Sequence, residues 1–148
     1  MALNLEALKT QLDLLFRTRP VRLAYLFGSQ TTGRATAESD IDVAVLFAQE
    51  LDGPARLAER LALVEGLIRL LRTDAVDVAV LNDASPLLAM EVLRTGKIVY
   101  KAGEMDRIDF QVRTVREYED TEPLRRLLAE AMDARLRAGT YGTPTLKK

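Results

Sequence analysis

The chain has 148 residues, of which 48% are hydrophobic, and its 21 basic and 22 acidic residues leave a net charge of −1. This length and apolar content suffice for one globular domain with a sizeable core, and the near-neutral charge disfavours non-specific binding of nucleic acid. The sequence contains no cysteine and no histidine, which excludes disulfides, thiolate or imidazole metal ligands and imidazole bases. Carboxylates and hydroxyls must therefore carry any chemistry.

Helical and strand patterns alternate through the first half of the chain. Apolar residues recur at spacings of three and four over residues 3–18, which predicts an amphipathic helix that Pro20 ends. The short apolar runs 21–27 and 41–47 predict two strands, joined by a connection rich in glycine and threonine. A second apolar stripe, with a proline in its first turn, predicts a helix over residues 54–72.

A third strand and the elements after it complete a small sheet. The valine-rich run 75–81 predicts a strand, and Ser85 and Gly96 are typical start and stop signals of the helix between them. A short edge strand is expected over residues 97–102. This order of elements predicts an α/β (α+β) fold with a small mixed β-sheet and helices packed on it.

The region 105–139 is charged, with sparse apolar positions, and Pro123 divides it into two helical segments. We expect it to form a C-terminal helical arm that docks elsewhere, beside a core of about residues 1–103. The tail 140–148 lacks periodicity and is expected to be mobile. Since no repeat or long linker divides the chain, residues 1–148 are expected to form one domain.

Charged residues interrupt the leucines near the N-terminus. Glu6, Lys9 and Asp13 are atypical of a signal-peptide core, and no apolar stretch reaches 18 residues. These features predict a cytoplasmic protein without membrane contact.

The stretch from Gly28 to Gly33 has the glycine spacing of a phosphate-binding P-loop and follows a predicted strand. Arg34 occupies the position of the P-loop lysine, however, and Ala35 that of the metal-binding hydroxyl, so the P-loop chemistry is missing. Backbone N–H groups and the Ser29 hydroxyl remain available to hold phosphate oxygens.

Two acidic residues stand at the start of the second strand. Asp40 and Asp42 are two positions apart and therefore face the same side of a strand, and Ser39 just before them can hydrogen-bond locally. At about 4 Å and an effective dielectric of about 20, their repulsion would be roughly 4 kcal/mol, which calls for a cation or a raised pKa. Carboxylate oxygens favour Mg²⁺ or Mn²⁺. If the third strand pairs beside the second, Asp77 joins the same cluster.

The pattern of Gly28 and Ser29, ten intervening residues, Asp40-x-Asp42 and then Asp77 one strand later resembles the nucleotidyltransferase superfamily of DNA polymerase β. More narrowly, it is similar to the minimal nucleotidyltransferases (MNT), antitoxins that act beside HEPN-domain toxins. The likeness extends over nearly the whole chain, through SDIDVAVLF, VDVAVLN, SPLLAMEVLRTGKIVY and VREYEDTEPLRRLL.

The resemblance implies a role for each residue of the pattern. Gly28 and Ser29 would bind the triphosphate of ATP. Asp40 and Asp42 would hold two Mg²⁺ or Mn²⁺ ions, and Asp77 would complete one metal site and help to deprotonate the acceptor hydroxyl. The reaction implied is transfer of AMP from ATP to a tyrosine of the HEPN toxin, which blocks its RNase activity within a hetero-oligomer.

One departure from the family pattern concerns the nucleotide. Relatives often carry a basic residue between the serine and the second glycine, where this chain has Gln30, Thr31 and Thr32. Arg34 is the candidate substitute, and Ser39 is a further candidate contact to the nucleotide.

Simpler roles and other functions stay open at this point. Asp40 and Asp42 can also cap a solvated strand end, Asp77 can pair with an arginine, Gly28 can serve a tight turn, and Arg34 can be a solvated loop residue. The alternative functions are nucleotide transfer to a small molecule such as an aminoglycoside, and an antitoxin that only binds its toxin.

Overall fold

The computed structural model describes residues 4–28 and 40–139. The predicted mobile tail and the glycine- and threonine-rich connection lie outside the described residues. The helices are α1 (Leu5–Arg17), α3 (Gly53–Leu71), α4 (Pro86–Thr95), α5 (Glu104–Asp120) and α6 (Glu122–Arg137). The strands are β1 (Val21–Phe27), β2 (Ile41–Phe47), β3 (Val76–Val80) and β4 (Lys97–Lys101), and a 3₁₀ turn, η1 (Leu81–Asp83), follows β3.

Side-chain caps set the starts of three helices. The side chains of Asn4, Asp52 and Ser85 each accept a hydrogen bond from a backbone N–H in the first turn of the helix that follows. A proline stands in the first turn of α3 and α4, where no N–H is needed. The helices and strands predicted from the sequence are confirmed, with small differences at their ends.

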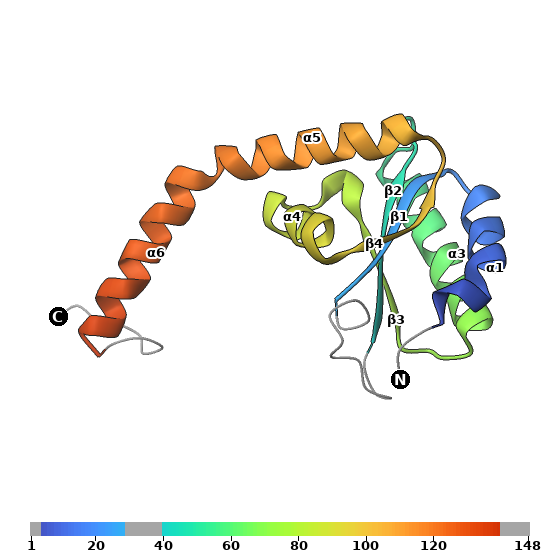
Figure 1. Cartoon of the computed structure of the whole chain (residues 1–148), viewed down its shortest axis with the longest axis horizontal. Coiled ribbons are helices and arrows are strands. Elements are labelled where there is room, and N and C mark those ends of the chain that lie inside the picture. The colour runs from blue at the N-terminus through green and yellow to red at the C-terminus, as the bar shows by residue number, and fades with distance from the viewer. Residues whose placement is uncertain (1–3, 29–39, 140–148) are drawn as a thin grey trace.

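The strands form one mixed sheet in the order β3-β2-β1-β4. β1 is antiparallel to β2 and β4, whereas β2 and β3 are parallel (Figure 1). β4 is an edge strand, as predicted, and β3 forms the opposite edge. The α/β fold with a small mixed sheet is confirmed.

Helices cover both faces of this sheet. One core cluster joins α1 and α3 to β2 through residues such as Phe16, Leu63 and Val45. The other joins α4 and α5 to β1 through Val92 and other buried residues. Among the described residues, no helix is long and apolar enough to cross a membrane.

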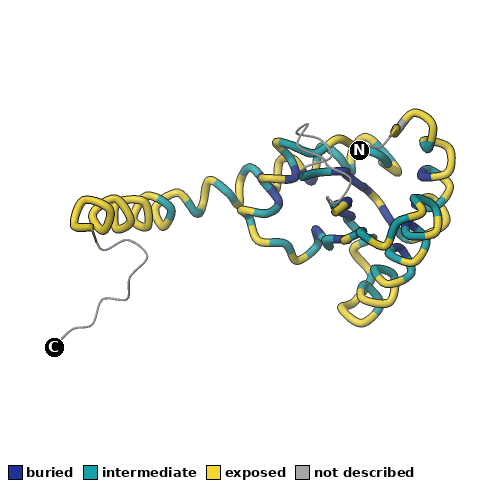
Figure 2. Tube along the Cα trace, turned by 90° about the horizontal axis from the view of Figure 1, so that it is seen from below, coloured by how far each residue is buried: buried dark blue, intermediate teal, exposed yellow. Residues whose placement is uncertain are grey.

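Helix α5 takes part in the core, which the charged pattern of residues 105–139 did not indicate. Phe110 is 1% exposed, and its ring centroid lies 5.8 Å from that of Tyr25 on β1. Thr114, one turn further, is also buried. Helix α6, by contrast, has no buried residue and extends away from the body of the molecule (Figures 1 and 2).

Replacing Phe110 with alanine should lower the free energy of unfolding by about 3–5 kcal/mol, because it leaves a cavity beside Tyr25. The matched control is Val112→Ala on the same helix, whose parent side chain is 50% exposed. We expect the control to change the free energy of unfolding by no more than about 0.5 kcal/mol. Urea denaturation of both variants measures the difference, and equal losses would contradict the packing described here.

Candidate active site

Three strand ends meet at one end of the sheet. Because β1 is antiparallel and β3 parallel to β2, the C-terminal end of β1 lies beside the N-terminal ends of β2 and β3. In this register Phe27 lies opposite Asp42, and Asp42 lies opposite Asp77. The predicted pairing of the two valine-rich strands is confirmed, and it places Asp77 directly beside Asp42.

Asp42 and Asp77 lie on the face of the sheet that carries α4 and α5. Val43 and Val78, the next residues along the two strands, belong to the core cluster under α1 and α3. Ala44 belongs to the other cluster. Since successive side chains of a strand alternate between its faces, the two carboxylates share the face of Ala44.

The three candidate carboxylates differ in exposure. Asp40 and Asp77 are exposed, whereas Asp42 is partly buried. Burial raises the pKa of Asp42 above its ordinary value, and the negative charges of Asp77 and Asp40 raise this pKa further. The negative charge of Asp42 is therefore destabilised in this structure, as expected of a carboxylate that binds a cation.

Gly28 directly follows β1, and its backbone lies close to the Asp42 carboxylate. Its φ of +78° is strained for any residue with a side chain, and an added Cβ would lie 2.7 Å from Oδ2 of Asp42. The position thus needs glycine for its turn and also for the close approach of the backbone to this carboxylate.

Arg60 of α3 is a residue of this site that the sequence did not indicate. Its Nε donates to the backbone carbonyl oxygen of Val78 over 2.7 Å, and its Nη2 donates to Oδ1 of Asp77 over 3.2 Å. The arginine partner that the sequence left open for Asp77 is therefore present. No sequence pattern marks Arg60, because it lies 17 residues before Asp77 and comes from a different element.

The donor set fits a hard divalent cation only in part. Asp40 and Asp42 offer carboxylate oxygens, the ligands that Mg²⁺ and Mn²⁺ prefer, and the raised pKa of Asp42 reflects charge that such an ion would neutralise. Within residues 4–28 and 40–139, however, no three acidic side chains are arranged to hold one metal ion together. The cation at Asp77 in this structure is Arg60.

The remaining candidates of the sequence pattern, Ser29, Arg34 and Ser39, lie outside the described residues. Their expected contacts to the nucleotide stay predictions.

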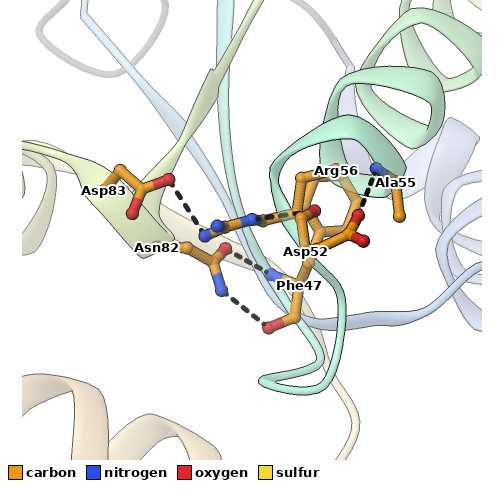
Figure 3. A network of polar contacts seen from close by, with 6 residues as sticks. All are labelled: Phe47, Asp52, Ala55, Arg56, Asn82 and Asp83. Atoms are coloured by element: carbon orange, nitrogen blue, oxygen red, sulfur yellow. Dashed lines mark hydrogen bonds and ion pairs between the residues drawn. The ribbon is translucent and has the colours of Figure 1, made fainter.

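A cavity of about 930 Å³ lies at the other end of the sheet, at the C-terminal end of β2 and the N-terminal end of α3. Figure 3 shows the polar contacts on one of its walls: the Asn82 amide bonds both the N–H and the C=O of Phe47, and Arg56 pairs with Asp83 at 2.9 Å. These polar groups bond one another, and Asn82 connects the segment after β3 to the C-terminal end of β2. The carboxylate site is separate from this cavity.

Asp42→Asn should raise the free energy of unfolding at neutral pH in buffer with a metal chelator. A pKa that is higher in the folded state means that stability falls as pH rises from the ordinary carboxyl pKa through the raised one, so the folded wild type is penalised above this window. The gain of the variant should vanish below about pH 4. Chemical denaturation across pH measures it. The control is Asp13→Asn, which alters only a surface pair with Arg17.

Comparison with known proteins agrees with this site. Residues 10–105 match the family model described as polymerase beta, nucleotidyltransferase. The chain is 35% identical over 123 residues to the protein adenylyltransferase MntA of Shewanella oneidensis, covering 82% of this chain and 83% of that protein.

Solved structures of similar proteins extend the likeness to the fold. One is a crystal structure of a toxin–antitoxin with AMP-PNP, with a TM-score of 0.69 and 33% identity, covering 87% of this chain and 98% of that one. Another is the MNT antitoxin in complex with a tri-AMPylated HEPN toxin of Shewanella oneidensis, with a TM-score of 0.65 and 29% identity, covering 86% and 97%. The chain therefore belongs to the polymerase β nucleotidyltransferase family.

Proposed function

We propose that this protein is a metal-dependent nucleotidyltransferase that moves AMP from ATP to a tyrosine of a HEPN-domain toxin and so acts as its antitoxin. The observation that carries this proposal is the pairing of Asp42 with Asp77 across β2 and β3, with Gly28 closed over the Asp42 carboxylate. The relative named as a protein adenylyltransferase and the solved complex with AMP-PNP support the donor nucleotide. A reaction that consumes ATP is expected to take place in the cytoplasm.

Asp40 and Asp42 are the residues that would hold Mg²⁺ or Mn²⁺. When bound, these ions supply activation of the attacking hydroxyl and neutralisation of the leaving pyrophosphate. Partial burial fixes the Asp42 carboxylate beneath Gly28, at the point where the backbone leaves β1. Ser29, Ser39 and Arg34 are the proposed contacts to the triphosphate, on the strength of the sequence pattern.

Asp77 is proposed to serve the acceptor. Its side chain is 63% exposed at the edge of the sheet, where a residue of another protein can reach it. The tyrosine oxygen forms a bond to the α-phosphorus, the bond from this phosphorus to the β-phosphate oxygen breaks, and pyrophosphate leaves. Asp77 takes the proton of the hydroxyl as general base.

Two other functions are weighed against the same structure. Transfer to a small molecule such as an aminoglycoside would need a binding pocket beside the carboxylates, whereas the 930 Å³ cavity lies at the other end of the sheet. An antitoxin that only binds its toxin is compatible with the Arg60–Asp77 ion pair, because that function needs no metal.

Intact mass measurement separates these functions. Incubation with a cognate HEPN-domain toxin, ATP and Mg²⁺ should add whole adenylate units to the toxin. Asp42→Asn should abolish both transfer and Mg²⁺-dependent ATP binding, whereas Asp77→Asn should keep ATP binding and lower transfer by about 10²-fold or more, because a general base is lost. An inhibited but unmodified toxin would establish the binding-only function instead.

The partner surface is proposed to be the apolar face of α6. Its members are spaced three and four residues apart, each is 49–61% exposed, and they are Leu124, Leu127, Leu128, Met132 and Leu136. A helix with such an uncovered stripe is typical of one that packs against a partner. We assign the HEPN toxin to this face because solved relatives of this chain are complexes with that toxin.

The double variant Leu127→Gln/Leu128→Gln should keep the stability of the wild type, because no residue of α6 is buried. It should weaken toxin binding by about tenfold or more, since burial of one leucine contributes about 1.5–3 kcal/mol. Calorimetric titration of the toxin measures the affinity. Glu130→Gln, on the polar side of the same helix, is the control, and an equal effect of both changes would place the toxin elsewhere.

A further inference from the structure

Arg60 reaches the site from the opposite face of the sheet. Helix α3 packs on the face shared with α1, through Leu63 and Leu67, whereas Asp42 and Asp77 lie on the other face. Since β3 is an edge strand, a side chain from α3 can pass around this edge. Arg60 does so and meets the strand at Val78 and Asp77.

The guanidinium is fixed by the backbone before it meets the carboxylate. Its shorter hydrogen bond, 2.7 Å, goes to the carbonyl oxygen of Val78, which does not move with the Asp77 side chain. Its second, 3.2 Å, goes to Oδ1 of Asp77. Two bonds from one planar group hold it more firmly than a single contact would. Arg60 therefore sets where Oδ1 of Asp77 lies.

Another arginine of the same helix illustrates the contrast. Arg69 pairs with Glu65 one turn away, and both side chains are more than 70% exposed. Such a pair contributes little and positions nothing. The Arg60 side chain is 33% exposed and that of Asp77 63%, and their pair joins two elements that are distant in the chain. The hydrogen bond from Arg60 goes to Oδ1 of Asp77, and Oδ2 is the other oxygen of this carboxylate.

We propose that Arg60 is a positioning residue for the transfer reaction: it holds Oδ1 of Asp77 so that Oδ2 meets the acceptor hydroxyl, and it offsets part of the negative charge that attracts the metal. This inference deepens the proposed function and rests on it. The two effects have opposite consequences, because a fixed carboxylate favours transfer whereas a neighbouring positive charge weakens metal binding.

The test compares Arg60→Gln, Arg60→Lys, Asp77→Asn and the double variant Arg60→Gln/Asp77→Asn. Transfer to the toxin is followed by intact mass, and Mn²⁺ affinity is measured with Mn²⁺ alone by electron paramagnetic resonance. Arg60→Gln should slow transfer by about 10-fold to 100-fold, because Asp77 loses its partner. It should also bind Mn²⁺ several-fold more tightly, because a nearby positive charge is removed. Arg60→Lys keeps the positive charge but lacks the planar guanidinium that bonds both Val78 and Asp77. It should therefore retain wild-type Mn²⁺ affinity, with a transfer rate between those of the wild type and Arg60→Gln.

The slower transfer of Arg60→Gln should be absent in the Asp77→Asn background, because Arg60 acts on transfer through Asp77, whereas the tighter Mn²⁺ binding should persist there, because it follows from the loss of the Arg60 charge. Arg69→Gln is the matched control on the same helix and should match the wild type in both measurements. Three results would each overturn the proposal. Arg60→Gln could leave transfer unchanged, or it could slow transfer while weakening Mn²⁺ binding. Arg60→Gln could also slow transfer further in the Asp77→Asn background. If the wild type transfers no AMP, the proposed function fails, and the Mn²⁺ measurement still decides whether the charge of Arg60 opposes cation binding.

Discussion

The register between β2 and β3 determines which residues meet at the site. Side chains of a strand alternate with a period of two, so a slip by one residue would turn Asp77 towards α3 and move Val78 out of the core. Val78 is 1% exposed and packs with Leu63 and Leu67, which makes that slip costly. The strand pair is also fastened at both ends.

These fastenings are polar. At the carboxylate end, the N–H of Ile41 donates to the carbonyl oxygen of Ala75 over 2.7 Å. At the other end, the Asn82 amide bonds both backbone groups of Phe47, which gives the network of Figure 3 a structural purpose. The apolar core and these two fastenings together permit an arrangement in which like charges face each other on adjacent strands, a pairing that destabilises a sheet by itself.

The sequence predicted the sheet and the acidic cluster because both depend on local patterns. Alternating apolar runs indicate strands, and the pairing of the two valine-rich runs brings Asp42 opposite Asp77, whereas Asp40 lies just before β2 begins at Ile41. Arg60 and Phe110 follow from no such pattern. Arg60 acts across the edge of β3 from another element, and Phe110 is a single apolar residue that packs against Tyr25 in an otherwise charged helix. Such contacts depend on the tertiary fold, which no spacing in the sequence reveals.

Contacts of one arginine link α5 to α6. Arg125 of α6 donates to Oγ1 of Thr121 and to the carbonyl oxygen of Tyr118, and its guanidinium stacks 3.9 Å from the centre of the Tyr118 ring. Helix α5 is itself anchored in the core at Phe110, so these contacts connect α6 to the body of the molecule, from which it projects (Figure 1). An arm connected in this way would determine how far a protein bound to it lies from the carboxylates. If the toxin binds α6 as proposed, the distance from this helix would select which of its residues reaches the carboxylates, without any recognition of the sequence around that residue.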